Sequence, residues 1–113
     1  MTRPDDCSKV ITLSDLLLQH RLGQMRLASA RLERSRAQMA AIDKAAAPAD
    51  LPDVTADRVA CEYRRWADAR KAELNEVIAR QALDALDARA AAETAFGRVQ
   101  ALRGIADRLK GKR

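Results

Sequence analysis

The side chains that most often do chemistry are scarce here, since the chain has one histidine, His20, and two cysteines, Cys7 and Cys61. A catalytic histidine needs an acid or base close by, and His20 has none in a recognisable motif. No histidine or second cysteine lies at metal-ligand spacing from either thiol. The sequence therefore predicts no enzyme activity, no metal site and no cofactor, and it predicts reduced thiols rather than a disulfide.

Two of the three aromatic residues, Tyr63 and Trp66, lie three positions apart. In a helix this spacing puts both side chains on one face, about one turn apart. They form an exposed binding patch, of the kind that supplies interface hot spots, or they pack over Met39 or Ile42 of the preceding helix. The residues alone leave both interpretations open.

The elements that position this pair are separated by one break in a helical pattern. Ala-, Arg- and Leu-rich segments flank the stretch Ala47-Pro48-Ala49-Asp50-Leu51-Pro52-Asp53. Proline lacks the amide proton and disfavours helix in the residue before it, so the chain must leave the helix there and can reverse. The sequence predicts an all-α fold, an antiparallel two-helix coiled-coil hairpin with a longer second helix.

We expect a single structural unit with a helix over about 12–46, a turn over 47–54, a helix over about 55–109 and a basic tail over 110–113. Thr12 or Ser14 is the expected cap of the first helix and Thr55 that of the second. The second helix is expected to overhang the first, so that about 90–109 projects as an arm. A bend at Gly97 is the alternative.

The expected contact between the helices is a heptad seam. In the first helix a row of large apolar residues recurs every seven positions, and a second row, Leu22, Ser29 and Arg36, becomes polar. Between Ala79 and Ala95 of the second helix the contact face is largely alanine, which buries little area per residue and predicts marginal stability. The apolar row consists of Ile11, Leu18, Met25, Leu32 and Met39.

The net charge of +5 is unevenly placed. The segment from Arg98 to Arg113 has six basic residues and one acidic residue, whereas Pro48 to Asp57 has three acidic residues and no basic one. This asymmetry suggests different partners at the two ends. The basic tail has no aromatic platform for single strands, so no nucleic acid is expected. No apolar run or signal peptide is visible, which favours a cytoplasmic protein.

The second helix also resembles a known family. The run CEYRRWADARKAELNEVIARQALDALDARAAAETAFGRVQALRGIADRL, from Cys61 to Leu109, is similar to the second helix of FliJ, a component of the flagellar type III export apparatus, and of its injectisome relative YscO. The matching features are the aromatic step at Tyr63 and Trp66, the polar, alanine-rich middle and the closing GRVQALRGIADRL. The leucine-led start LSDLLLQHRLGQMRLASARLE fits the first helix more loosely.

The resemblance implies a two-helix stalk that links the hexameric export ATPase to the cytoplasmic domain of the export-gate membrane protein. Tyr63 and Trp66 match the patch that contacts the gate. By position, Arg98, Arg103 and Arg108 would lie in the end that enters the ATPase pore. The implied location is the cytoplasm, peripherally associated with the membrane export apparatus. Export chaperones remain open as further partners. The chain is short for the family, mainly in its first helix and turn.

Two other functions stay open at this point. The protein would be a self-associating structural coiled coil if the polar seam at Ser29 and Arg36 takes a second copy. Alternatively, it would be a basic helical protein that binds nucleic acid. In that case its affinity for duplex or single-stranded nucleic acid should fall steeply as the salt concentration rises.

Overall fold

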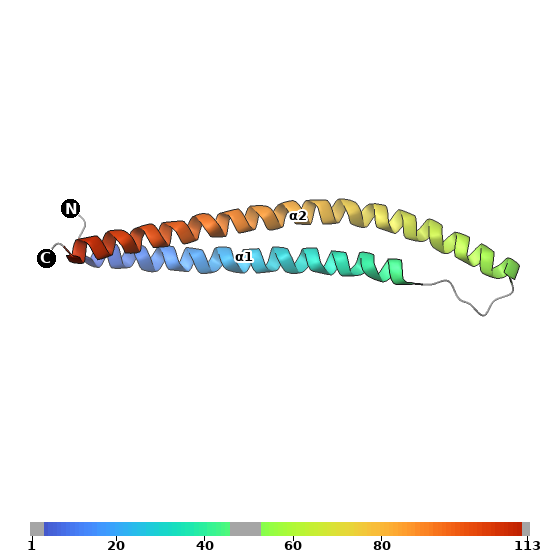
Figure 1. Cartoon of the computed structure of the whole chain (residues 1–113), viewed down its shortest axis with the longest axis horizontal. Helices are drawn as coiled ribbons and strands as arrows, with labels where there is room; N and C mark the ends of the chain where they lie inside the picture. Colours follow the sequence, from blue (N-terminus) through green and yellow to red (C-terminus); the bar gives the residue numbers. More distant parts are fainter. Residues whose placement is uncertain (1–3, 46–52, 112–113) are drawn as a thin grey trace. The chain divides into compact units, whose positions relative to one another are not determined.

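A computed structural model describes residues 4–45 and 53–111, and within them the chain forms two helices (Figure 1). Helix α1 spans Pro4–Lys44 and helix α2 spans Asp53–Gly111. The fold is all-α, an antiparallel two-helix hairpin as predicted, and α2 with 59 residues is longer than α1 with 41. Pro48 and Pro52, on which the predicted turn depends, lie outside the described residues, as do 112–113 of the predicted tail.

Helix α1 begins at Pro4, so the predicted start near Thr12 or Ser14 is wrong. Proline suits the first helical position because the amide proton it lacks would have no partner there. Two acidic residues in the first turn then complement the helix dipole. The Thr12 hydroxyl donates to the Ser8 carbonyl oxygen at 3.0 Å, a bond inside the helix rather than a cap.

Helix α2 begins at Asp53, so Thr55 lies inside the helix and is not its cap. At its other end α2 continues to Gly111, with Arg108 and Lys110 in the last turn. Basic side chains there interact favourably with the partial negative charge of the helix C-terminus. Lys110 and Gly111 therefore belong to the helix and not to a separate tail.

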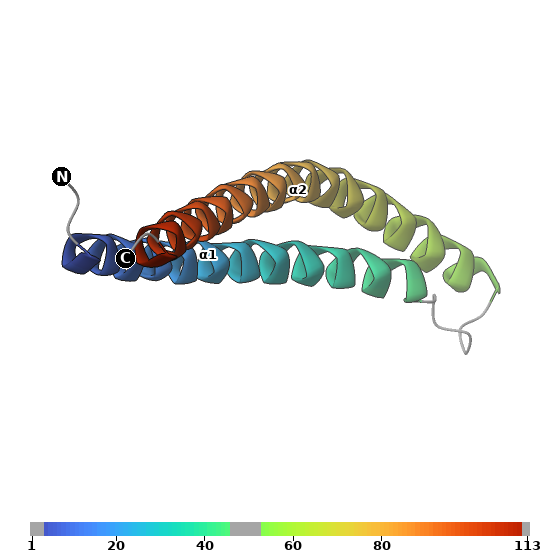
Figure 2. The ribbon, with the colours of Figure 1, turned by 60° about the vertical axis from the view of Figure 1, so that its left-hand side comes forward.

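The helices contribute to two compact units, which we call the terminal unit and the middle unit. The terminal unit comprises Met1–Ser29 and Asp84–Arg113, and the middle unit comprises Ala30–Leu83. In both views of the ribbon, the blue first part of α1 lies beside the red last part of α2, which together form the terminal unit (Figures 1 and 2). Each unit thus pairs one stretch of α1 with one stretch of α2.

The core of the terminal unit shows that the end of α2 is paired. Leu18 packs with Ala95 and Val99, and Leu22 packs against this cluster. Val99 is only 1% exposed. The predicted projecting arm over 90–109 is therefore wrong, because the early start of α1 supplies the turns that cover it. Helix α2 is also continuous through Gly97, so it does not bend back there.

The seam of α1 agrees with one predicted row and not with the other. Leu18 and Leu32 of the predicted apolar row are buried, and its other members are half-buried. Ser29 and Arg36 of the second row are exposed, so that part of the prediction is wrong. The second row lies three residues after the first rather than four, and all its members are buried or half-buried: Ser14, Arg21, Ala28, Ser35 and Ile42.

One polar atom in the middle unit is buried without a partner. The Gln81 side-chain oxygen is shut off from solvent and has no hydrogen-bond partner among the described residues. An unsatisfied buried polar group of this kind costs about 1–3 kcal/mol. Rotating the amide would only exchange the oxygen for its nitrogen.

We expect Gln81→Met to raise the free energy of unfolding by about 1–2 kcal/mol, because an apolar side chain of similar length needs no partner. Urea unfolding followed by circular dichroism measures the change. Gln100→Met, at an exposed position of the same helix, is the matched control and should shift stability by no more than about 0.5 kcal/mol. Equal shifts in the two variants would contradict the prediction.

Candidate interaction surfaces

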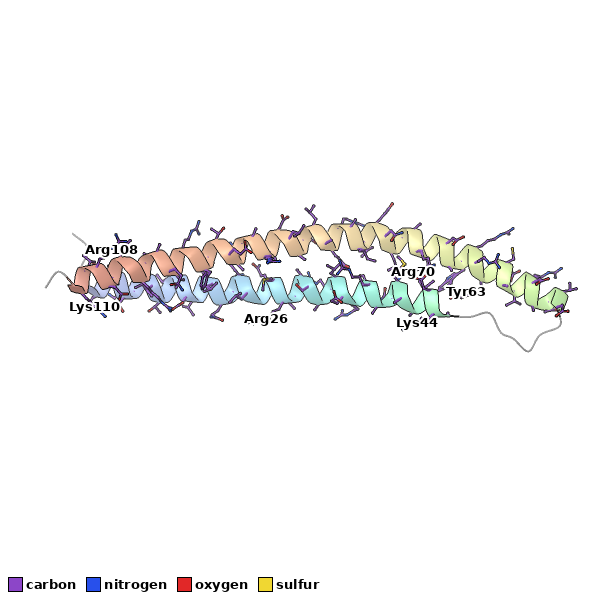
Figure 3. All side chains as sticks on the ribbon, viewed as in Figure 1. Arg26, Lys44, Tyr63, Arg70, Arg108 and Lys110 are labelled. Carbon is purple, nitrogen blue, oxygen red and sulfur yellow. The ribbon has the colours of Figure 1, made fainter. Side chains whose placement is uncertain are left out.

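The two residues of the aromatic pair have different surroundings. Tyr63 is half-buried, and its hydroxyl donates to the carbonyl oxygen of Ile42 at 3.0 Å. Ile42 belongs to the last turn of α1, where carbonyl groups generally have no partner within the helix. In Figure 3 the Tyr63 side chain extends from α2 toward the end of α1 that carries Lys44. Tyr63 therefore ties α2 to the end of α1, as the packing interpretation of the sequence expected.

Trp66 remains at the surface, with 55% of its area exposed. Its ring centroid lies 5.6 Å from that of Tyr63, with 40° between the ring planes. Tilted aromatic pairs at this separation attract one another. Trp66 thus lies beside Tyr63 and keeps more than half of its area exposed to solvent, and its role in a binding patch stays a prediction.

Tyr63→Phe tests the role of the hydroxyl. The variant keeps the ring beside Trp66 but loses the bond to Ile42, and we expect the free energy of unfolding to fall by about 0.5–1.5 kcal/mol. Because Trp66 is the only tryptophan, its fluorescence reports unfolding of the middle unit directly. A variant as stable as the parent would show that the hydroxyl contributes nothing to holding the helices together.

The three arginines predicted near the ATPase also differ in their surroundings. The Nη2 atom of Arg103 lies 3.0 Å from Oδ2 of Asp15, which links α2 to α1 within the terminal unit. The Nε atom of Arg108 donates to the Gly104 carbonyl oxygen at 3.4 Å. Arg98 is exposed. Arg98 and Arg108 thus present charge to solvent, whereas Arg103 shares its charge with an acid of the facing helix.

A second ion pair between the helices lies in the middle unit, where Lys71 contacts Asp43. The hydrogen bond to Asp43 raises the pKa of Lys71 above its usual value of 10.5. A raised pKa in the folded protein means that the pair stabilises the fold at pH values below 10.5 and loses this effect as the pH rises through the folded pKa. Both side chains are partly exposed, so solvent screens the interaction and its contribution is small.

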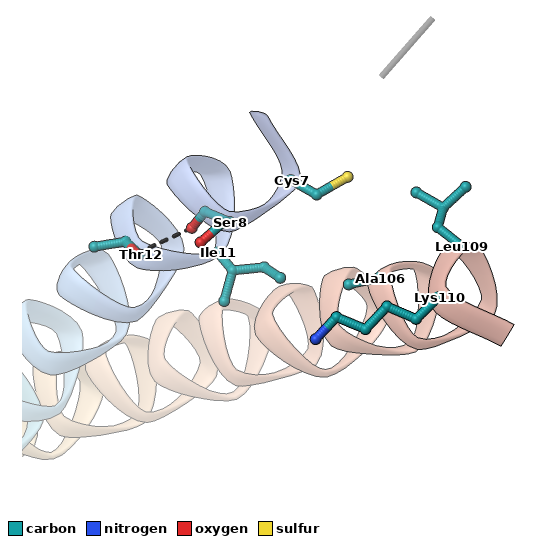
Figure 4. A pocket seen from close by; sticks show the side chains of 7 residues that line it. All are labelled: Cys7, Ser8, Ile11, Thr12, Ala106, Leu109 and Lys110. Carbon is teal, nitrogen blue, oxygen red and sulfur yellow. Dashed lines mark hydrogen bonds between the residues drawn. The ribbon is translucent and has the colours of Figure 1, made fainter. Parts of the chain in front are cut away.

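The ends of the two helices in the terminal unit enclose a small hollow of about 250 Å³ (Figure 4). Ile11, Ala106 and Leu109 supply apolar walls, and Cys7 and Lys110 lie at its edge. No carboxylate or imidazole is among its described lining residues. His20, the only histidine, is exposed elsewhere on α1. No sequence signal predicts this hollow, since it depends on the early start of α1.

Residues 4–45 and 53–111 contain neither a cluster of metal-binding side chains nor a membrane-spanning stretch. These residues hold no group of three or more His, Cys, Asp or Glu side chains placed to bind a metal ion. Neither α1 nor α2, as far as each is described, has a stretch long and apolar enough to span a membrane.

Of the residues predicted to contact the export gate and the ATPase, Trp66, Arg98 and Arg108 are thus exposed and make no hydrogen bond or ion pair with the other helix in the part of the chain described. Comparison of the chain with protein-family models, with curated proteins and with solved structures found no match.

Proposed function

We propose that this protein is a non-enzymatic coiled-coil component of the flagellar type III protein export apparatus. It acts as a stalk that links the hexameric export ATPase to the export gate, in the cytoplasm at the membrane-bound apparatus. The observation that carries the proposal is the exposed Trp66 ring, held by Tyr63 on a two-helix hairpin. This residue pair is one of the three features on which the resemblance of Cys61–Leu109 to the FliJ and YscO second helix depends.

The gate contact is assigned to Trp66, with Tyr63 as the residue that positions it. A large aromatic ring that keeps 55% of its area exposed is costly in water and is typical of interface hot spots. The Tyr63 hydroxyl is already bonded to α1, so Tyr63 contributes through its ring and through the orientation of Trp66.

The ATPase contact is assigned to the basic residues of the terminal unit. Arg98 and Arg108 are exposed and point charge toward solvent, which suits an electronegative partner surface. Arg103 is bound to Asp15, so its charge is partly neutralised within the hairpin. Arg98 and Arg108 are therefore expected to contribute more to the ATPase contact than Arg103.

The proposal is tested by measuring the affinity of the full chain for the gate's cytoplasmic domain and, separately, for the export ATPase. Trp66→Ala is expected to weaken gate binding by roughly thirtyfold, as loss of a hot-spot residue does, and to leave ATPase binding unchanged. Leu83→Ala is the matched control, because Leu83 is an apolar residue of the middle unit that is 59% exposed. Equal effects of the two variants would remove Trp66 from the gate contact.

The other half of the test uses the arginines. Joint replacement of Arg98 and Arg108 with Ala is expected to weaken ATPase binding and to spare gate binding. Asp15→Asn breaks the ion pair of Arg103 without removing a basic charge, so it separates the effect of that pair from the effect of charge. If the parent protein binds neither the ATPase nor the gate, the proposed function is wrong.

A further inference from the structure

Helix α1 carries a second row of uncharged side chains, beside the row that faces α2. Its members recur at alternating intervals of three and four, the spacing that keeps residues on one side of a helix in a coiled coil. Over the same stretch the seam contains charged Arg21, whereas the second row contains no charged residue. The row consists of Val10, Leu13, Leu17, His20, Gln24 and Leu27.

This row is exposed in the hairpin. Leu13 and Leu27 are 66% and 60% exposed, Val10 is 43% exposed and Leu17 is 38% exposed. The outward face of a surface helix normally carries charged and polar residues. Here the only charged residue between Val10 and His20 is Asp15, which is already bound to Arg103. Helix α1 therefore has two faces suited to helix packing, and α2 covers one of them.

We propose that the exposed row binds the same row of a second copy of this chain, with the two α1 helices antiparallel about a two-fold axis. The intervals of the row read the same in both directions, three, four, three, four, three. An axis that places Leu17 opposite His20 of the second copy therefore also places Val10 opposite Leu27 and Leu13 opposite Gln24. Such a self-complementary patch is what a two-fold interface requires.

The charges at the ends of the row select a second copy and the antiparallel direction. Asp6 lies one turn before Val10, and Arg31 lies one turn after Leu27 on the continuous helix α1. In the antiparallel pair, Asp6 of each copy lies opposite Arg31 of the other, so opposite charges meet at both ends. In a parallel pair, like charges would meet at both ends and repel one another.

Sedimentation velocity of the full chain over a range of concentrations tests the pairing. We expect a reversible monomer–dimer equilibrium, and we expect joint replacement of Leu13 and Leu17 with Asp to weaken the dimer about hundredfold, since each change occurs twice in a two-fold interface. Leu83→Asp is the matched control, because Leu83 is exposed but lies on α2 in the middle unit. A parent chain that stays monomeric at all concentrations overturns the proposal. The exposed row would then be a surface for a different protein.

Exchange of the end charges distinguishes antiparallel pairing from unspecific association of apolar surfaces. Asp6→Arg and Arg31→Asp are each expected to weaken the dimer about tenfold, because each places like charges together twice. The double variant restores opposite charges and is expected to recover the parent affinity to within about threefold. Asp6→Arg also removes an acidic residue from the first turn of α1, but this loss remains in the double variant and cannot explain a recovery. A double variant as weak as the singles overturns the antiparallel arrangement.

Discussion

Leu74→Ala is expected to lower the free energy of unfolding by about 2–5 kcal/mol, the largest loss from any single truncation in the middle unit. Leu74 is 2% exposed, and the other buried residues of this unit are Leu32, Ser35 and Ala67. Two of these three residues, Ser35 and Ala67, have small side chains, so the unit has few large buried side chains that could fill the space that the leucine leaves. The transfer free energy and the cavity therefore both count against the variant.

The measurement is guanidinium unfolding with two probes, Trp66 fluorescence for the middle unit and circular dichroism for all helix. Leu83→Ala is the control for the change in helix propensity and for the loss of apolar side-chain atoms, because Leu83 is 59% exposed. It should shift stability by no more than about 0.5 kcal/mol. If the two probes report different midpoints for Leu74→Ala, the units unfold separately and the loss belongs to the middle unit. Equal losses in the two leucine variants would show that Leu74 is not a core residue.

The number and type of elements could be predicted from the sequence because two prolines close together leave few alternatives to a reversal between two helices. The start of α1 was missed because Thr12 and Ser14 offered good caps. Pro4 followed by two acidic residues was an equally good start signal, and it is the one that the structure uses. This single error produced the second one, since a first helix that begins at 12 cannot cover the end of α2.

The seam could be predicted only where large apolar residues mark it. Ser14, Ala28 and Ser35 give little hydrophobic signal, yet Ser35 is buried and the other two are half-buried. Leu22 packs against the core, and it lies four residues after Leu18. It therefore favoured the prediction of a second row four residues after the first, whereas the buried row lies three residues after it. Small side chains can be buried because their size fits the facing helix, and a hydrophobic pattern within one helix does not predict such burial.

For the aromatic pair the sequence left open an exposed binding patch or packing over the first helix; in the structure Tyr63 contacts α1, whereas Trp66 is exposed. Tyrosine has a polar end, so it can reach an acceptor at a helix terminus while its ring packs. The carbonyl oxygen of Ile42 is that acceptor, and only the relative placement of the two helices brings it within 3.0 Å. No periodicity within either helix could have predicted this contact.

Few residues in the described part of the terminal unit are buried. Beside Leu18 they are Ala92, Ala95 and Val99, so little apolar area is removed from water there. At about 25 cal/mol per Å², such a seam stabilises the unit weakly. Any partner that binds only the folded form would add stability by mass action. A second copy on the exposed row of α1 and an ATPase on the arginines of α2 would both act on this unit, so the two contacts are expected to influence one another.

Replacing Gly23, Gly97 and Gly104 together with Ala is expected to raise the free energy of unfolding by about 2–3 kcal/mol, or about 1 kcal/mol for each position. All three lie in helix interiors, and none has the positive φ that would favour glycine. Apart from the flanking residues and the backbone of its own helix, a methyl group added at each would have no described atom within 4 Å. The change therefore removes conformational freedom from the unfolded chain without creating a clash.

Gly111→Ala serves as the matched control, because Gly111 has the same open space but is the last residue of α2, where glycine is not at a disadvantage. Urea unfolding should show the triple variant with an unchanged m-value and a higher midpoint, and Gly111→Ala close to the parent. A triple variant no more stable than the parent would mean that these glycines relieve strain in the folded helices. If the triple variant also binds the proposed partners less well, then binding requires local flexibility of the helices, because glycine has no side chain to make a contact.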